Sequence, residues 1–329
     1  MPPESSRPLV TVVIPSYNRE RFVTDAIDSV LQQDHADIEL IIIDDGSTDG
    51  SVRRIGDHLA ARSPSIRVDF QARQNRGKSA TLNTGLTRAK GRYFSLLDSD
   101  DVLEPGMVRT LATALGAAGA ETAASFGDGW VVDPVGRVQG RLSDTAPYRG
   151  GNVFMDLARL RFFPLIQSSL IRRHVLEQLG GFDERFKLLD DWDMWLRLTR
   201  RYEIAYVPSP VVRYRIHPEN RSSTELERFR DEARTVVKEV LAREADLGPH
   251  ARSIRAQLEA RLGALYYNVL RMRQARNHAA SALRLSPGNE LAWTVLLRSL
   301  LGATVVERLR ASRRRSGEPA TRQVAADQR

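Results

Sequence analysis

The fold class is indicated by one stretch near the start of the chain, Leu9-Val10-Thr11-Val12-Val13-Ile14-Pro15-Ser16-Tyr17-Asn18. A β-branched apolar run that stops at a proline is typical of a buried strand followed by a loop. A helical pattern over residues 20–33 comes next, and Glu39–Ile43 is a second apolar run that ends in the polar loop Asp44–Ser47. The chain therefore opens with a strand, a helix and a second strand.

The same alternation continues to about residue 97. Apolar periodicity predicts helices over 51–61 and 79–89 and strands over 66–70 and 93–97. Alternating strands and helices predict an α/β fold with a mainly parallel sheet, helices on both faces, and ligands at the carboxyl ends of the strands. Residues 122–152 contain short β-like pieces with Gly and Pro, and we expect a less regular part that holds an acceptor or second ligand.

The chain beyond residue 225 is rich in Ala, Leu, Arg and Glu with helical periodicity, which predicts a small all-helical region. We therefore expect a catalytic domain over 1–220, a helical region over 221–310 and a basic, disordered tail over 311–329. One stretch of the helical region has the spacing of a single tetratricopeptide-type repeat, and an ordinary helical hairpin is the alternative. The residues at the repeat positions are Leu262, Gly263, Tyr266, Ala275, Ala282, Pro287 and Trp293.

Composition and charge exclude several classes of protein. The chain has 329 residues and no cysteine, so disulfides, Cys-ligated metals and thiol nucleophiles are excluded. It lacks a signal-peptide pattern, and its most apolar window, residues 291–306, contains Arg298 and is read as a buried or surface-lying helix. These features predict a cytoplasmic protein. About half of the net charge of +8 lies in the Arg-rich tail, which has seven Arg and three acids over residues 300–329. We expect this tail to make peripheral contact with an anionic membrane, and we expect no nucleic-acid binding.

An apolar strand runs directly into carboxylates at Asp98-Ser99-Asp100-Asp101. In an extended segment, residues two apart project to the same side, so Asp98 and Asp100 can meet on one hard cation. A Mg²⁺ or Mn²⁺ ion held in this way keeps open positions for a diphosphate. The alternative is a solvated turn in which Asp101 caps the next helix.

Two further polar segments follow predicted strands. Asp45, in Asp44–Asp49, can accept a hydrogen bond from a uracil-type base or contact a ribose, although an Asp-Gly turn explains the segment equally well. The segment Gly77-Lys78-Ser79 ends a near match to a phosphate-binding loop, in which Ala72 replaces the first glycine. A P-loop nucleotidase is therefore the alternative enzyme. Even if the segment is not a phosphate-binding loop, Arg76 and Lys78 are candidates for contacts with a phosphate group.

Asp190 and Asp191 open a predicted helix, where the helix dipole favours acids. Together with a metal–diphosphate site, Asp191 can act as the base that takes the proton of an incoming hydroxyl. His217 could add a metal ligand or a phosphate contact.

Five motifs in this order and spacing resemble a family 2 glycosyltransferase over residues 9 to about 220. The resemblance implies a GT-A fold, a nucleotide-sugar donor, a divalent metal (Mn²⁺ or Mg²⁺) and transfer with inversion at the anomeric carbon. The motifs are Val12–Asn18, Ile43–Asp49, Leu97–Asp101, Gly180–Glu184 and Asp190–Trp192.

The resemblance also implies roles for single residues. On the donor side these are Pro15, Tyr17, Asn18 and Asp45 for base and ribose, Lys78 for the nucleotide or diphosphate, and Asp98 and Ser99 for the donor. Asp100 is the principal metal ligand, with Asp98 and His217 as further ligands, and Asp191 is the general base. Two positions depart from the family pattern, because Leu82 stands where many relatives carry Arg and Asp190 where Glu is usual.

The expected activity is transfer of one hexosyl or N-acetylhexosaminyl unit, with a UDP-sugar favoured, to a hydroxyl of a glycan or lipid-linked glycan in cell-envelope polysaccharide biosynthesis. The lack of carboxy-terminal membrane spans argues against a processive synthase. A non-catalytic interaction module with a degenerate transferase domain is the main alternative outside enzymes. A sugar-1-phosphate nucleotidylyltransferase is disfavoured because Pro15-Ser16-Tyr17-Asn18, and no Gly-rich basic loop, follows the first strand.

Overall fold

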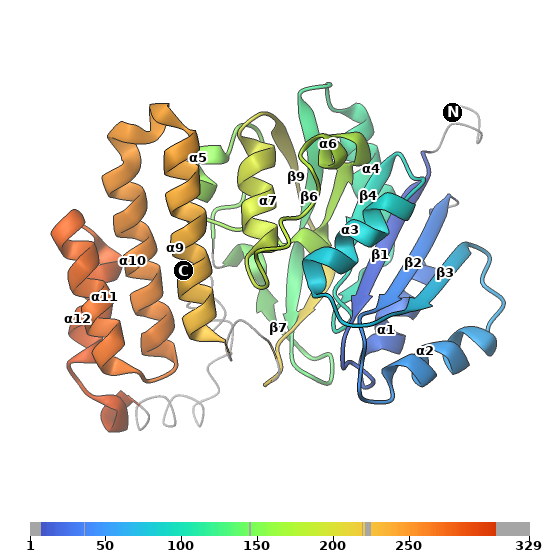
Figure 1. Ribbon diagram of the computed structural model, residues 1–329, viewed down its shortest axis with the longest axis horizontal. Helices are drawn as coiled ribbons and strands as arrows, with labels where there is room; N and C mark the ends of the chain where they lie inside the picture. The colour runs from blue at the N-terminus through green and yellow to red at the C-terminus, as the bar shows by residue number, and fades with distance from the viewer. Residues whose placement is uncertain (1–7, 36, 145, 219, 221–224, 307–329) are drawn as a thin grey trace. The chain divides into compact units, whose positions relative to one another are not determined.

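A computed structural model describes residues 8–35, 37–144, 146–218, 220 and 225–306 (Figure 1). The predicted division at residues 220 and 310 stays a prediction, and the basic tail over 311–329 lies outside the described residues. By internal contacts the chain forms two units. The first comprises Met1–Arg137, Tyr148–Val153 and Pro164–Arg215, and the second comprises Val138–Pro147, Phe154–Phe163 and Ile216–Arg329.

Strands and helices alternate through the first part of the first unit, as predicted. They are β1 (Val10–Ser16), α1 (Val23–Leu31), β2 (Ile38–Asp44), α2 (Ser51–Ala60), β3 (Arg67–Ala72), α3 (Lys78–Arg88) and β4 (Tyr93–Leu96). The unit continues with β5 (Val102–Leu103), α4 (Met107–Ala117), β6 (Thr122–Val132), β8 (Ser169–Arg172), α6 (Arg173–Gln178), α7 (Asp190–Thr199) and β9 (Glu203–Arg215).

The strands of the first unit form one mixed sheet in the order β3-β2-β1-β4-β8-β6-β9-β5. Strands β3, β2, β1 and β4 are parallel, β8 is antiparallel to both β4 and β6, and β6 is parallel to β9. The mainly parallel α/β fold is therefore confirmed. Ser16 at the end of β1 pairs with Asp44 at the end of β2, so the loops that follow these strands leave from the same edge of the sheet.

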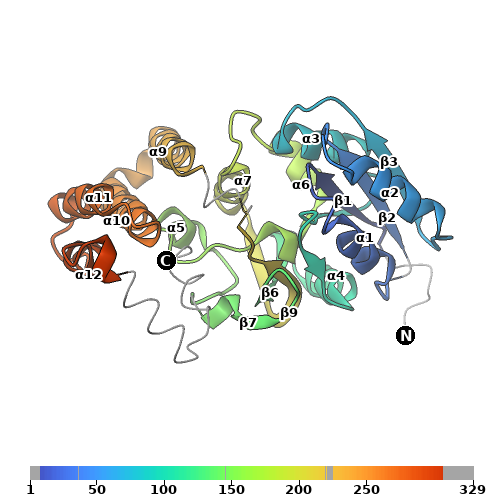
Figure 2. The ribbon, with the colours of Figure 1, turned by 90° about the horizontal axis from the view of Figure 1, so that it is seen from below.

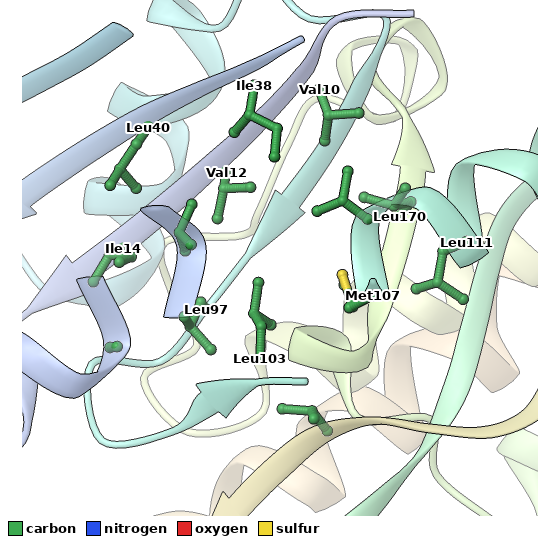
Figure 3. Packing of buried hydrophobic residues seen from close by; sticks show 14 of the residues in the cluster. Val10, Val12, Ile14, Ile38, Leu40, Leu97, Leu103, Met107, Leu111 and Leu170 are labelled. Carbon is green, nitrogen blue, oxygen red and sulfur yellow. The ribbon is translucent and has the colours of Figure 1, made fainter. Parts of the chain in front are cut away.

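Helices cover both faces of the parallel strands (Figure 2). Helices α1, α2 and α4 pack on one face, where Val10, Val12 and Ile14 of β1 point into a buried aliphatic core (Figure 3). The opposite face of β1 packs against α3, because a Cβ atom added to Gly85 would lie 2.7 Å from the side chain of Val13. Alternate residues of one strand thus face two helical layers, which is why the strand reads as a continuous apolar run.

The expectation of an irregular segment over residues 122–152 is wrong for its first part. Strand β6 spans 11 residues, is buried along nearly its whole length, and lies inside the sheet between β8 and β9. Its pairing with β9 shifts register on either side of Asp128, and the side chain of Val211 lies 2.5 Å from where a Cβ of Gly127 would be. Glycine and register shifts at a bulge hid the strand from its sequence pattern.

The second unit is helical beyond residue 225, as predicted. Its elements are β7 (Val138–Arg141), α5 (Phe154–Ala158), α9 (Leu226–Arg243), α10 (Ala251–Asn268), α11 (Met272–Leu285) and α12 (Glu290–Ser299). At the predicted repeat positions, α10 and α11 approach closely: a Cβ of Gly263 would lie 3.2 Å from the carbonyl oxygen of Ala275. Within the described ranges, no helix combines the length and apolarity that a membrane span needs.

Candidate active site

The loops that follow β1 and β2 interlock at the carboxyl edge of the sheet. Asn18 has a left-handed backbone (φ 52°), its N–H donates to Ser47 Oγ at 2.8 Å, and its Oδ1 accepts from the N–H of Thr48 at 2.8 Å. Ser47 in turn donates to Asp44 at 2.6 Å. Asn18, predicted as a donor-binding residue, therefore sets the shape of two loops at once.

The neighbours of Asn18 differ in exposure. The side chain of Tyr17 is 46% exposed beside this loop pair, whereas Pro15 is buried inside β1. Tyr17 is thus available to stack on a planar group such as a nucleotide base, and Pro15 contributes to the strand that carries it.

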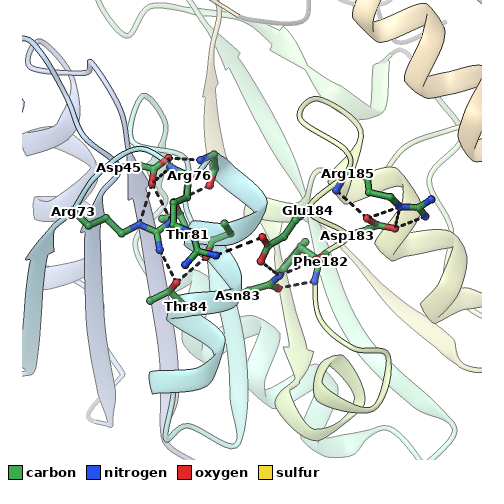
Figure 4. A network of polar contacts seen from close by, with 12 residues as sticks. Asp45, Arg73, Arg76, Thr81, Asn83, Thr84, Phe182, Asp183, Glu184 and Arg185 are labelled. Atoms are coloured by element: carbon green, nitrogen blue, oxygen red, sulfur yellow. Dashed lines mark hydrogen bonds and ion pairs between the residues drawn. The ribbon is translucent and has the colours of Figure 1, made fainter.

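Asp45 holds the loop that connects β3 to α3 (Figure 4). Its carboxylate is 3% exposed and accepts from the backbone N–H of Arg76 at 3.0 Å, the N–H of Gly77 at 2.7 Å and Nε of Arg73 at 3.0 Å. A side chain of the protein itself therefore occupies the amides that a phosphate-binding loop would offer to a phosphate. Strand β3 is also an edge strand and largely unburied, whereas a phosphate-binding loop follows a buried strand, so the P-loop alternative is disfavoured.

The acidic segment after β4 is a turn, which corrects the expectation that it stays extended. The N–H of Asp101 donates to the carbonyl of Asp98 at 3.0 Å and closes the turn. Asp98 pairs with Nζ of Lys78 at 2.6 Å, and Asp100 accepts from Nε of Arg19 at 2.9 Å. Each predicted metal-binding carboxylate is thus paired with a cation from another segment, and Ser99 between them is buried.

Asp101 anchors this turn to the sheet and does not cap a helix. The side chain is buried, and it accepts from Nε2 of Gln167 at 2.7 Å and from the backbone N–H of Arg215 at 2.8 Å. Burial, reinforced by the charges of Asp100 and Asp98, raises the pKa of Asp101 well above its usual range. The buried carboxyl group of Asp101 therefore fixes the turn to Gln167 and to the backbone of β9.

Lys78 connects the acidic turn with the start of α7. Burial alone would lower the pKa of Lys78, but the charges of Asp98, Asp190 and Asp191 raise it above its ordinary value, so the ammonium stays charged. Burial and the charge of Asp190 raise the pKa of Asp191 to about 7, while Lys78 and the N–H of Trp192 act in the opposite direction. Lys78, Asp98 and Asp191, predicted from three distant motifs, therefore share one electrostatic site.

The segment that leads into α7 is fastened to α3 (Figure 4). The side chain of Asn83 donates to the carbonyl of Phe182 at 2.9 Å and accepts from its N–H at 2.8 Å. Ser79 donates to the carbonyl of Phe186 at 2.7 Å. Gly181 has φ 72°, and a Cβ there would lie 2.5 Å from Oδ1 of Asn83. These contacts fix the approach of Asp191 toward Lys78.

Sequence reasoning missed several of these supporting residues, namely Arg19, Arg73, Asn83 and Gln167. Arg19 directly follows the predicted donor residue Asn18, and that position is the signal that could have identified it. The pairing of Asn83 with the Gly180-Gly181 turn joins residues about 100 positions apart and leaves no local pattern.

The acidic turn carries the type of donor atom that a hard divalent cation prefers. Asp98 and Asp100 offer carboxylate oxygens from one turn, the ligand type that Mg²⁺ and Mn²⁺ prefer, and a bound diphosphate would supply further oxygens. Across the part of the chain that the structure describes, no group of three or more His, Asp or Glu side chains could hold a metal ion. His217 is buried, and its backbone N–H donates to Oδ1 of Asn220 at 2.6 Å; its role as a metal ligand stays a prediction.

Comparison with known families assigns the class of protein. The family described as Glycosyl transferase family 2 matches residues 11–180, slightly more than half of the chain. A second family, described as Glycosyltransferase like family 2, matches residues 152–246. The chain belongs to glycosyl transferase family 2 and is a glycosyltransferase.

Curated relatives are named as glycosyltransferases. An uncharacterized glycosyltransferase of Rickettsia prowazekii is 27% identical over 230 residues, which cover 68% of this chain and 69% of the relative. One of Nostoc sp. is 30% identical over 227 residues, 64% of this chain and 66% of the relative. An uncharacterized glycosyltransferase of Rickettsia felis is 27% identical over 223 residues, which cover 65% of this chain but only 35% of the relative.

Solved structures share the fold. A crystal structure of S. aureus TarS in complex with UDP-GlcNAc has a TM-score of 0.63 at 18% identity and covers 92% of both chains. The mannosyltransferase PcManGT from Pyrobaculum calidifontis, in complex with GDP-Man and Mn²⁺, has a TM-score of 0.59 at 20% identity and covers 93% of this chain and 88% of its own. The GT-A fold expected from the sequence is confirmed.

Proposed function

We propose that this chain transfers a single sugar from a nucleoside-diphosphate sugar, with a UDP-sugar favoured, to a hydroxyl of a glycan or lipid-linked glycan, with inversion at the anomeric carbon. The observation that carries the proposal is the position of Lys78. Its ammonium pairs with Asp98 of the acidic turn and also interacts with the charges of Asp190 and Asp191. These interactions support a single site for the groups that we assign to the donor and to the acceptor.

Asp191 has the properties of a general base. Its carboxylate accepts the N–H of Trp192 at 2.7 Å, which orients it at the start of α7, and its pKa of about 7 places it near neutral pH, where a base works best. The acceptor hydroxyl gives its proton to Asp191 while its oxygen bonds to the anomeric carbon. The bond from that carbon to the diphosphate breaks on the opposite face, which inverts the configuration.

Positive charge near the acidic turn suits the leaving diphosphate. Lys78 stays charged, and Arg19 lies beside Asp100. A divalent cation held by Asp100 and Asp98, Mn²⁺ or Mg²⁺, would supply Lewis-acid neutralisation of the charge that develops on the diphosphate. The PcManGT complex with Mn²⁺ supports the choice of ion.

The donor class is tested first by thermal unfolding with UDP, GDP, dTDP and CDP, each with and without Mn²⁺ or Mg²⁺. A ligand at 100 times its dissociation constant stabilises the folded state by about 2.7 kcal/mol, a rise of a few degrees for a chain of this size. We expect a metal-dependent shift with UDP that Asp100→Ala abolishes and that Asp28→Asn, on α1, keeps. The absence of a shift with every diphosphate would overturn the proposed donor site.

The general base is tested by separating donor binding from turnover. Asp191→Asn should keep the metal-dependent UDP shift but lower the rate of UDP release from UDP-sugars in the presence of glycan acceptors by about 100-fold or more. Asp28→Asn again serves as the matched carboxylate control. Normal turnover by Asp191→Asn would assign the base elsewhere, and a retained configuration in the product would contradict single displacement.

A further inference from the structure

Arg19 forms an ion pair with one of the two carboxylates that the proposed function assigns to a divalent cation. Its Nε donates to Oδ2 of Asp100 at 2.9 Å, and the two side chains are 15% and 13% exposed. Solvent and salt screen such a shielded pair less than a pair on the open surface. A divalent cation that binds Asp100 must therefore share this carboxylate with the guanidinium of Arg19 or take it over.

The backbone of Arg19 is held on both sides. Its N–H donates to Oγ of Ser51 at 2.9 Å, and its carbonyl accepts from the N–H of Phe22 at 2.9 Å and from that of Val23 at 3.0 Å. The base of the side chain is thus fixed between the starts of α1 and α2. Because an arginine side chain has several rotatable bonds, its guanidinium can change partner while the backbone stays in place.

A diphosphate offers Arg19 a second partner of suitable chemistry. The planar guanidinium presents its N–H groups as a fork and can bind phosphate oxygens with two parallel hydrogen bonds. Arg19 directly follows Asn18, and its Nη1 donates to the carbonyl of Asn18 at 3.0 Å, whereas its Nε reaches the acidic turn. Arg19 therefore connects the loop that we assign to the nucleoside with the turn that we assign to the diphosphate and the cation.

We propose that Arg19 is a positioning residue that exchanges partners. Its guanidinium holds Asp100 until a nucleoside diphosphate binds, and it then moves to the phosphates and leaves Asp100 to the divalent cation. This inference rests on the proposed function, because it needs a diphosphate donor and a cation at Asp100. Its consequence is that Arg19 competes with the cation before the donor arrives, so the donor and the cation strengthen each other's binding.

Binding of Mn²⁺ to the full chain tests the proposal without any need for turnover. Electron paramagnetic resonance measures free Mn²⁺ during a titration without nucleotide, and calorimetry measures the affinity for UDP with and without Mn²⁺. We expect Arg19→Gln to bind Mn²⁺ about tenfold more tightly than the wild type in the absence of UDP, because it removes a charged hydrogen bond that the cation otherwise replaces. The factor by which Mn²⁺ raises the affinity for UDP should fall by a similar amount, since the coupling is reciprocal.

Two further variants serve as controls. Arg62→Gln removes an ion pair of the same length, 2.9 Å, between Arg62 and Asp28, and should leave both affinities unchanged. Arg19→Lys keeps the positive charge and should stay closer to the wild type than Arg19→Gln does.

The outcomes separate this inference from the proposed function. Equal or weaker Mn²⁺ binding by Arg19→Gln would overturn the exchange, because a purely structural contact would loosen the turn when it is lost. Tighter Mn²⁺ binding with an unchanged effect of Mn²⁺ on UDP affinity would also overturn it, and would show that Arg19 acts through its charge alone. If neither the wild type nor Arg19→Gln binds Mn²⁺ or a nucleoside diphosphate, the proposed donor site fails together with the exchange.

Discussion

Asn83 and Gly181 offer a sharp test of how the site is assembled. If the side chain of Asn83 fastens Phe182 as described, a methyl group on Gly181 acts on stability in two ways. It strains a backbone with φ 72°, and it displaces the Asn83 carbonyl oxygen that lies 2.5 Å from the added atom. The second effect requires Asn83, so the two substitutions must be coupled.

The magnitudes follow from the contacts. Asn83→Ala removes two hydrogen bonds with the backbone of Phe182, each worth about 0.5–1.5 kcal/mol, and should lower the free energy of unfolding by about 2 kcal/mol. Gly181→Ala costs about 1–2 kcal/mol in backbone strain and about 2 kcal/mol more in lost Asn83 contacts. In the double variant only the strain is added, so it should be about 2 kcal/mol more stable than the sum of the single effects predicts.

Urea unfolding, followed by tryptophan fluorescence to which Trp192 and Trp195 in α7 contribute, measures this coupling. Gly180→Ala is the matched control: Gly180 has φ 79° but no atom within 4 Å of an added Cβ, so its substitution should show strain and no coupling to Asn83→Ala. Additive effects for Gly181→Ala, or equal coupling for both glycines, would refute the reasoning.

Three further outcomes are expected. The turnover rate should rise with pH through about 7, because Asp191 acts when deprotonated, and Asp190→Asn should lower the pKa seen in the pH–rate profile by removing a neighbouring negative charge; an unmoved profile would contradict the assignment. Lys78→Met should shift that pKa upward and weaken UDP binding in calorimetry, and a downward shift would show that Lys78 does not face the base. Gly263→Val should lower the free energy of unfolding by about 1–3 kcal/mol, because the larger side chain overpacks α10 against α11. The affinity of this variant for UDP should equal that of the wild type, which would show that the change is confined to the second unit.

The parallel half of the fold could be predicted from the sequence because each strand is covered on both faces. Such strands become continuous apolar runs, and the segment expected over 39–43 is the strand Ile38–Asp44. Strand β6 could not be predicted in the same way, because its register shifts at Asp128 and its glycines interrupt the pattern. Its place in the sheet is determined by partners that lie far away in sequence.

The candidate site shows the same limit. Lys78, Asp98 and Asp100 follow predicted strands, so their presence at the sheet edge could be expected. The partners that hold them could not, because Arg19 pairs with Asp100 across 81 residues and Gln167 reaches Asp101 across 66. The expectation that Asp98 and Asp100 project to the same side of an extended strand also failed, because β4 ends at Leu96 and the chain then forms a turn.

The buried carboxylate of Asp45 has a consequence for the catalytic cycle. A loop whose amides have only substrate phosphate to bind loses its order whenever product leaves, and each new donor must restore it at an entropic cost. Here Asp45 acts as a resident counter-ion for Arg73 and for the amides of Arg76 and Gly77. The loop is therefore ordered by contacts within the folded chain, and Lys78, which follows it directly, is held in its pair with Asp98 without a bound phosphate.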